Sequence, residues 1–346
     1  MTGHKKNVRI ADIAAECALS PITVSRALRQ DAAVSESTRT RVIAAAERMG
    51  YHPRAKMGRP EQPKAANPTV DIVLDRDMAP TSMFTTELLV SIEQELSARG
   101  YDCIVRTTAS EYAHFLPLYQ ELEHSKSSGT MILGYLPVEQ LQAVLELLPN
   151  AILVDNTGDP RLECAYHSVG FDNVEAARLA VGHLIQTGRR RIALITGDPE
   201  HYFSRGIEQG YREALARAGI PVDAALIEHA HFTPRAAADA VRSLAERGIA
   251  FDAVFTSDEN AVGVLRALHE RGLPCPGRVA VAGCDGLPIG EHTIPTLTSV
   301  ELDYRALGRA AVERLLAVGE GQPPCRMLLL PRLRVRESTG AAHQKG

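Results

Sequence analysis

Beyond residue 70 the chain alternates short apolar runs with longer segments of helical periodicity, and this alternation constrains the fold more than any other feature. One set of strand-like runs covers 70–74, 101–105, 130–133 and 151–154, and a second covers 191–196, 225–228, 253–256 and 279–282. Between them lie helical patterns near 86–99, 112–124, 138–147, 207–218, 234–247 and 260–271. Such alternation predicts parallel sheets with helices on both faces. Because there are two sets, we expect two similar lobes rather than one large sheet.

A cleft between the two lobes is the expected ligand site. Ligands of open α/β sheets bind beyond the carboxyl ends of the strands. Gly283 and Gly286 flank Cys284 and Asp285 at one such end. These glycines suit either a tight turn or the close approach of a ligand to the backbone.

The N-terminal segment differs from this body in charge. Residues 1–66 carry 12 Lys and Arg against 6 Asp and Glu, whereas the rest carry 26 against 36, within totals of 38 and 42. A basic segment on an acidic body is typical of a nucleic-acid-binding arm, because phosphate neutralisation needs clustered cations. A charge surplus of this size also occurs on surfaces that are merely solvated.

Three short helices are predicted between residues 9 and 50. The first places four apolar residues on one face at helical spacing: Ile10, Ile13, Ala14 and Cys17. The second begins at Ser20 and Pro21, a favoured N-cap followed by a proline at the first helical position. The third starts at Ser35. The tight turn between the first two predicts a helix-turn-helix, whose second helix enters the major groove of DNA.

The second helix presents a mixed face to solvent. Its outward residues are Ile22, Thr23, Ser25, Arg26 and Arg29. Hydroxyl groups suit DNA phosphates, and an arginine suits the edge of guanine. A small structural three-helix bundle with ordinary surface polarity is the alternative that this pattern leaves open.

Residues 8–28 and 34–53 resemble the headpiece of the LacI/GalR family of bacterial repressors, with the 20–28 stretch most similar to its gluconate-repressor branch. The combination of Thr23-Val24-Ser25-Arg26 with Gly50-Tyr51 carries the resemblance. It places base-reading residues at Pro21, Ile22 and Arg26. It places phosphate contacts and caps at Ser20, Thr23, Ser25, Ser35 and Thr38. Arg29, Tyr51 and Arg59 complete the expected DNA contacts.

The same resemblance covers the body to about Glu337. It implies a two-lobed effector sensor, similar to periplasmic sugar-binding proteins, with three crossings between the lobes and a homodimeric assembly. Matched position by position to the family, the resemblance implies seven effector-binding residues in the cleft: Phe84, Asp155, Arg205, Phe232, Ser257, Asp258 and Asp285. Each has a structural alternative: aspartates after strands cap turns, phenylalanines fill cores, and Asp258 suits a helix start. Ile207 stands where the family usually has an arginine, which weakens the carry-over.

Signals for catalysis or metal binding are weak. The chain contains no GxGxxG, GxxxxGK[ST], GxSxG or HExxH motif. His229 and His231 lack an evident third ligand, and Cys164 with His167 lacks a group to orient them. The six cysteines form no CxxC pair and are expected to be reduced thiols. We therefore expect neither an enzyme nor a cofactor or metal.

The expected organisation is a headpiece at 1–56, a linker at 57–69 and a two-lobed domain at 70–340. Lobe 1 is assigned to about 70–167 plus 296–323, and lobe 2 to about 168–295 plus 324–337. No run of 18 apolar residues and no secretory h-region occurs, so a cytoplasmic protein is expected.

The predicted function is a transcriptional repressor that binds pseudo-palindromic double-stranded operator DNA. Its operator affinity would be controlled by a sugar, sugar acid or similar metabolite. The alternatives are a sugar receptor or a sugar-acting enzyme without a DNA role.

The linker departs from the family pattern of a hinge helix with a leucine wedge. Pro60 and Gly58 disfavour a helix, and only Met57 offers a short wedge. Gly58-Arg59-Pro60 resembles the core of an AT-hook, which lays arginine into a narrow A·T minor groove. A disordered tether is the alternative.

Overall fold

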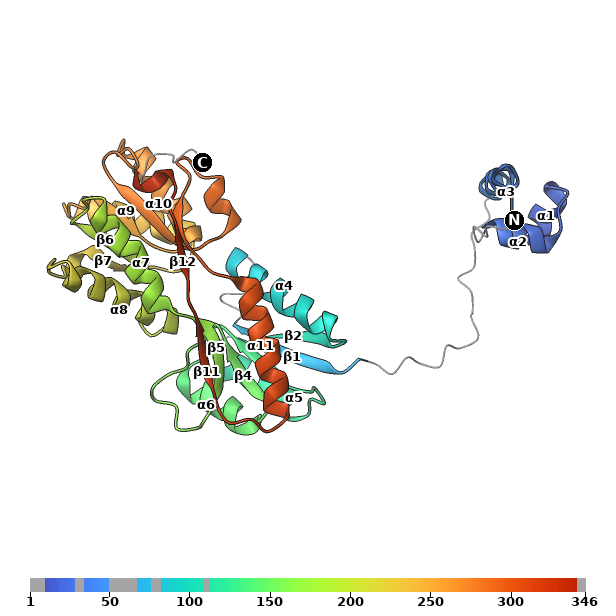
Figure 1. The fold of residues 1–346 in the computed structure, drawn as a ribbon, viewed down its shortest axis with the longest axis horizontal. Coiled ribbons are helices and arrows are strands. Elements are labelled where there is room, and N and C mark those ends of the chain that lie inside the picture. The colour runs from blue at the N-terminus through green and yellow to red at the C-terminus, as the bar shows by residue number, and fades with distance from the viewer. Residues whose placement is uncertain (1–9, 29–33, 50–66, 76–81, 109–111, 341–346) are drawn as a thin grey trace, which may run out of the picture. The chain divides into compact units, whose positions relative to one another are not determined.

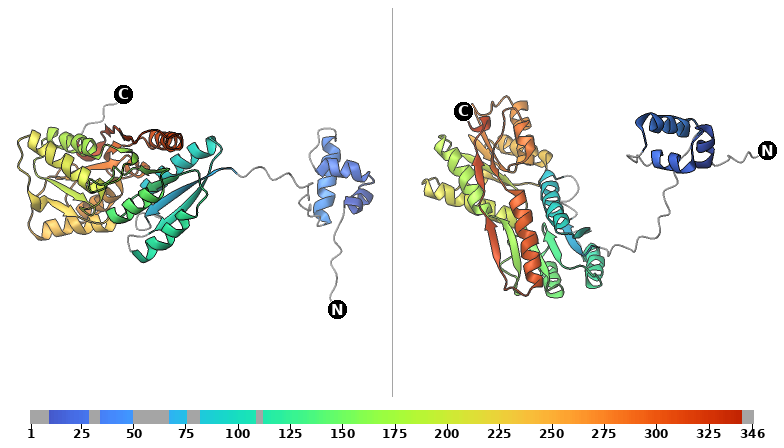
Figure 2. Two further views of the ribbon diagram at one scale, coloured as in Figure 1. Left: turned by 90° about the horizontal axis from the view of Figure 1, so that it is seen from below. Right: turned by 45° about the vertical axis from the view of Figure 1, so that its right-hand side comes forward.

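The computed structural model describes residues 10–28, 34–49, 67–75, 82–108 and 112–340, and the chain divides into two compact units. The first unit is Met1–Ala66 and the second is Asn67–Gly346. Figures 1 and 2 show the helical first unit and the larger α/β second unit. Among the described residues, no helix combines the length and apolarity needed to cross a bilayer.

The described part of the first unit contains three helices, α1 (Ile10–Glu16), α2 (Pro21–Leu28) and α3 (Glu36–Arg48). The turn between α1 and α2 closes with a hydrogen bond from the Leu19 N–H to the Ala14 carbonyl (2.9 Å), and Ala18 adopts a left-handed φ of 50°. Nine buried side chains form its core: Ile13, Ala14, Cys17, Val24, Ala27, Val34, Val42, Ala45 and Ala46. The helix-turn-helix expected from the spacing is thus present.

The second unit contains two six-stranded sheets of matching design. The first has the order β11-β5-β4-β3-β1-β2 and is parallel throughout. Its strands are β1 (Thr69–Asp75), β2 (Asp102–Thr108), β3 (Thr130–Leu133), β4 (Ala151–Val154), β5 (His167–Phe171) and β11 (Arg326–Leu329). The second has the order β12-β10-β9-β8-β6-β7, with only β12 antiparallel to its neighbour. Its strands are β6 (Ile192–Thr196), β7 (Ile227–His229), β8 (Ala253–Phe255), β9 (Ala280–Asp285), β10 (Thr298–Glu301) and β12 (Arg332–Arg334).

Helices cover both faces of each sheet, as parallel sheets require (Figure 1). In lobe 1, α4 (Met83–Ala98) and α11 (Tyr304–Gly319) pack on one face, and α5 (Tyr112–Glu123) and α6 (Val138–Leu147) pack on the other. In lobe 2, the pairs are α7 (Asn173–Gln186) with α8 (Tyr202–Arg217) and α9 (Pro234–Glu246) with α10 (Asp258–Glu270). The described part of this unit also contains three short 3-10 turns, at Ala224–Leu226, Pro288–Glu291 and Glu337–Thr339.

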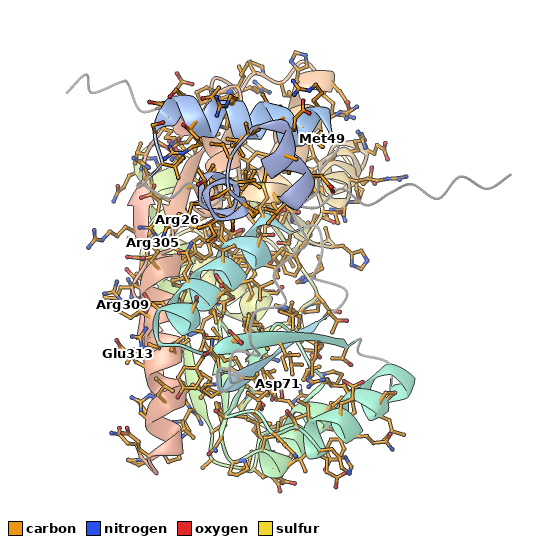
Figure 3. All side chains as sticks on the ribbon, turned by 90° about the vertical axis from the view of Figure 1, so that its right-hand side faces the viewer. Arg26, Met49, Asp71, Arg305, Arg309 and Glu313 are labelled. Atoms are coloured by element: carbon orange, nitrogen blue, oxygen red, sulfur yellow. The ribbon has the colours of Figure 1, made fainter. Side chains whose placement is uncertain are left out.

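Helices α4 and α11 contact each other through ion pairs at the surface and through apolar side chains beneath them. Arg305, Arg309 and Glu313 follow one another along α11 (Figure 3). The Arg309 guanidinium lies 3.9 Å from Glu95, and that of Arg99 lies 3.5 Å from Glu313. Exposed ion pairs of this kind contribute little to stability. The buried leucines and alanines beneath them therefore hold the two helices together.

The lobe boundaries expected from the sequence are wrong by several residues. β5 and β11 belong to the first sheet and β10 to the second, whereas each had been assigned to the opposite lobe. The described chain crosses between lobes three times, after β5, after β10 and between β11 and β12. Strand partnership is set by long-range pairing, so the apolar pattern of a crossing strand does not reveal its sheet.

Candidate functional site

The solvent-exposed face of α2 is the first candidate site. Ser20 caps the helix, because its hydroxyl accepts a hydrogen bond from the Thr23 N–H (3.1 Å) and pairs with the Thr23 hydroxyl (2.8 Å). Val24 and Ala27 are buried, which turns Pro21, Ile22 and Arg26 outward. Ile22 is 67% exposed. This face therefore offers an apolar side chain and a guanidinium to a partner.

The remaining expected DNA contacts fall into two groups. Ser35 caps α3 through the Thr38 N–H (3.4 Å) and also bonds the Thr38 hydroxyl (2.9 Å). Ser35 is exposed, and the side chains of Thr23, Ser25 and Thr38 are half-buried. Arg29, Tyr51 and Arg59, together with residues 57–66 of the linker assigned to 57–69, lie outside the described residues.

A cleft in the second unit is the second candidate site. Both lobes line it, through Ser82, Phe84, Asp155, His201, Tyr202, Phe203, Phe232, Ser257, Glu259 and Asp285. Its volume of about 40 Å³ is far below the ~300–1,000 Å³ of ordinary small-molecule sites. The lobes are therefore closed on each other, and they must separate to admit a ligand of sugar size.

Five of the seven expected cleft residues come together there: Phe84, Asp155, Phe232, Ser257 and Asp285. Asp155 follows β4 and Asp285 ends β9, so both stand at carboxyl ends of strands. Both have left-handed backbones, with φ of 52° and 121°. Such conformations are strained for residues other than glycine and often occur at functional sites.

Burial changes the acidity of these two carboxyl groups. It raises the pKa of Asp155 to about 7, against a hydrogen bond from the Tyr202 hydroxyl (3.2 Å) that lowers it. Burial also raises the pKa of Asp285 well above its usual range, and the nearby carboxylates of Asp258, Glu259 and Asp155 raise it further. Both carboxyl groups thus lie where burial disfavours their charged forms.

Asp258 does not line the cleft, contrary to expectation. Its carboxylate is buried and accepts hydrogen bonds from the Ser299 hydroxyl (2.6 Å) and the Leu287 N–H (2.7 Å). These bonds tie the start of α10 to β10 and to the loop after β9. Asp258 therefore has a structural role, since both donors lie inside lobe 2.

Arg205 is also misplaced by the sequence reasoning. Its guanidinium lies 3.1 Å from Asp159 and donates to the Glu200 carbonyl (2.9 Å), on the wall of a separate cavity of about 410 Å³. The register of α8 explains this, because Tyr202, Ile207 and Tyr211 are among its buried residues and Arg205 is not. Arg205 instead joins the two lobes through Asp159.

Five lining residues were missed: Ser82, His201, Tyr202, Phe203 and Glu259. Each lies at or next to the start of α4, α8 or α10, which follow strands of the two sheets. Applying the carboxyl-end rule to every strand would have identified these helix starts. Glu259 bridges the lobes, accepting hydrogen bonds from the Ser82 hydroxyl (2.9 Å) and the Met83 N–H (3.1 Å).

Aromatic side chains form the apolar wall of the cleft. The His201 ring stacks on Tyr202 at 4.4 Å and meets Phe232 edge-on at 5.3 Å. Phe232 rests against Gly197, where an added Cβ would lie only 2.2 Å from its ring. Only glycine at 197 leaves room for this placement. Such a wall suits the C–H face of a sugar ring.

The weak enzyme signals gain no geometric support. Among the described residues, no group of three His, Cys, Asp or Glu side chains is placed to hold a metal. The His229 ring bonds the Gly197 carbonyl (3.1 Å). Burial raises the pKa of Cys164, which disfavours a reactive thiolate.

Two family profiles match the chain. That of the bacterial regulatory proteins of the lacI family covers residues 9–54, and that of the periplasmic binding protein-like domain covers 181–339. The HTH-type transcriptional regulator CelR of Thermobifida fusca is 32% identical, over 91% of this chain and 94% of its own length. The HTH-type transcriptional regulator AscG of Escherichia coli (strain K12) is 30% identical, over 90% and 93%.

Two solved structures are similar over almost the whole chain. The complex of CelR with cellobiose has a TM-score of 0.73 at 29% identity, covering 96% of this chain and 100% of that one. The lac repressor dimer bound to operator and the anti-inducer ONPF has a TM-score of 0.69 at 25% identity, covering 96% and 99%.

These matches confirm the expected fold class, a helix-turn-helix headpiece followed by a two-lobed, periplasmic-binding-protein-like domain. The similarity to the gluconate-repressor branch stays a prediction. The chain belongs to the LacI family of bacterial transcriptional regulators.

Proposed function

We propose that the protein is a homodimeric, cytoplasmic repressor whose affinity for a pseudo-palindromic operator changes when a sugar-class effector binds in the cleft. The carrying observation is that both lobes contribute side chains to one closed cleft. A ligand bound there contacts both lobes, so it changes the free energy of separating them. A ligand shifts a conformational equilibrium only when its contacts differ between the two conformations. The relatives named above, a cellobiose-bound regulator and an operator-bound repressor dimer, support the same assignment.

The DNA contacts of this proposal are those of the α2 face and its flanking caps. Arg26 and Ile22 would reach base edges, since arginine pairs with guanine and an apolar side chain packs on the thymine methyl. Ser20, Thr23, Ser25, Ser35 and Thr38 would contact phosphates. We also propose that Arg29, Tyr51 and Arg59 contact DNA.

The effector contacts of this proposal are Phe84, Asp155, Phe232, Ser257 and Asp285. Carboxylates accept hydrogen bonds from hydroxyl groups, and aromatic faces pack on C–H surfaces. We assign no catalytic residue, cofactor or metal ion, so the protein would act by binding alone.

A DNA-selection experiment followed by a gel shift tests this function. The full-length protein should enrich a two-fold symmetric site from random duplexes, and its binding should weaken steeply with salt. Addition of the sugar that most raises the thermal midpoint should then change operator affinity. Enrichment of no sequence would favour a ligand receptor without a DNA role.

A further inference from the structure

The cleft gathers three carboxyl groups, and no cation in its described wall balances their charge when they ionise. Asp155, Asp285 and Glu259 line it, and none of the described lining residues is Lys or Arg. Glu259 is engaged by the start of α4, and Asp155 accepts one hydrogen bond from Tyr202. The Asp285 carboxylate accepts a hydrogen bond from the Asp258 backbone N–H, which is not a cation. Buried carboxylates without a counter-charge are costly, so a ligand that brings a positive group offsets that cost.

His201 offers the cleft a hydrogen-bond donor. Its Nδ1 accepts from the Phe203 N–H (3.2 Å), so the neutral ring carries its proton on Nε2. Nε2 is buried and has no hydrogen-bond partner within the described ranges, and His201 is only 5% exposed. Burial lowers the pKa of His201 to about 4, which keeps the ring neutral. A ligand oxygen would satisfy this N–H.

Aromatic rings form the apolar part of the cleft wall. Phe84, Phe203 and Phe232 line the cleft, and the last two rings meet edge-on at 5.7 Å. Rings arranged in this way pack on the C–H face of a saturated ring. The lining is therefore complementary to a molecule that combines three features: a positive group, a hydroxyl oxygen and a C–H face.

We propose that the effector is a polyhydroxylated amine of the amino-sugar class, held by its ammonium group between Asp155 and Asp285. A hydroxyl oxygen of the ligand accepts the hydrogen bond of His201, and its C–H face packs on Phe232. The inference rests on the proposed function, because it names the ligand class of the same cleft.

Calorimetry on the full-length protein at pH 7 tests the inference with three matched sets. Each set holds an amino sugar, its neutral parent and the corresponding sugar acid: glucosamine, glucose and gluconate, then the galacto and manno counterparts. In at least one set the amine should bind roughly tenfold or more tightly than its neutral parent, because charge-assisted hydrogen bonds are the stronger ones. If the neutral or acidic member equals the amine in every set, or if no amine binds, the proposal is overturned.

Two variants locate the effect. Asp285→Asn should lower the ratio of amine to neutral affinity toward one, because it removes one of the two carboxylates that hold the ammonium group. The control is Asp239→Asn, which removes the same charge from an exposed residue paired with Arg242 on α9; it should leave the ratio unchanged. Retention of the amine preference in Asp285→Asn contradicts the assignment.

The amine advantage should shrink between pH 7 and 5.5, as the cleft carboxylates take up protons, because the ammonium group of the ligand is already mostly protonated over this range. The titratable groups that face Asp155 and Asp285 are Tyr202, Asp258, Glu259, Cys284 and Tyr304. Burial raises the pKa of Cys284 and of Tyr304 well above their usual ranges, so both groups stay protonated throughout this pH range. A pH-independent ratio contradicts an ammonium–carboxylate contact.

Operator binding in the same samples separates this inference from the proposed function. A protein that binds its operator and responds to a neutral sugar, but not to an amine, overturns the amine proposal alone. A protein that selects no operator overturns the proposed function, whatever its ligand.

Discussion

Asp155 and Asp285 occupy equivalent positions in the two lobes. β4 and β9 are each third in the order of their sheet, and each aspartate stands at the carboxyl end of its strand with a positive φ. The two sheets therefore present their carboxylates to one cleft from opposite sides. Both residues have a positive φ, 52° at Asp155 and 121° at Asp285, and positive φ values in residues other than glycine often occur at functional sites.

The Asp285→Ala variant should lose its response to the effector and keep its affinity for the operator in the absence of effector. The change removes a carboxylate from the cleft wall and leaves the headpiece untouched. Calorimetry measures effector binding, and a gel shift measures operator affinity. Unchanged effector binding would remove Asp285 from the site.

The Asp155→Asn variant should be the more stable protein at high pH. The folded-state pKa of about 7 lies above the usual 3.8, so the stability linked to this carboxyl is present below pH 4 and lost as pH rises through 7. At pH 8, asparagine should therefore raise the free energy of unfolding by about 1–3 kcal/mol, with little change at pH 4. Urea unfolding at the two pH values measures the difference.

The free energy of unfolding of Asp155→Asn should still decrease somewhat as pH rises, because burial also raises the pKa of Asp285. Tyr202, Cys284 and Tyr304 also surround the two carboxyl groups. A difference in free energy of unfolding between Asp155→Asn and the wild type that is the same at pH 8 as at pH 4 would contradict the assigned burial.

Asp258→Ala should destabilise the effector domain by about 1–3 kcal/mol, because it leaves the Leu287 N–H and the Ser299 hydroxyl without their acceptor. Ser299→Ala removes only one of the two bonds and should cost less. Thermal unfolding ranks the variants. A stable Asp258→Ala protein that no longer binds effector would return Asp258 to the cleft.

Arg26→Ala should cost about 1–3 kcal/mol at the selected operator and leave binding to random duplex nearly unchanged. The reason is the exposed position of Arg26 on α2, beside Ile22. Fluorescence anisotropy with the two duplexes gives both affinities. Equal losses on both would make Arg26 a phosphate contact.

The linker prediction concerns Arg59, outside the described residues. If Gly58-Arg59-Pro60 forms a minor-groove arm, operators with A·T-rich centres should bind better than those with C·G centres. Arg59→Ala should then erase that preference. A mutant that ranks the centres as the wild type does would leave the linker as a tether.

The sequence was informative where local chemistry decides the outcome. Short apolar runs that alternate with segments of helical periodicity predicted two α/β lobes, and the family resemblance placed Asp155 and Asp285 in the cleft. The partners of β5, β10 and β11 were not predictable, because sheet membership depends on pairing across long sequence separations. Arg205 was misplaced because the buried face of α8 is set by tertiary packing around Tyr211.

The measurement that bears most directly on this account is the operator affinity of the full-length protein with and without a ligand bound in the cleft. The ligand is the sugar that most raises the thermal midpoint, at about 100 times its Kd, where it adds about 2.7 kcal/mol to the folded state. We predict that operator affinity changes by about tenfold or more, as is usual for coupling between sites, and that Asp285→Ala abolishes the change. An operator affinity that stays the same while the cleft is occupied would contradict the account.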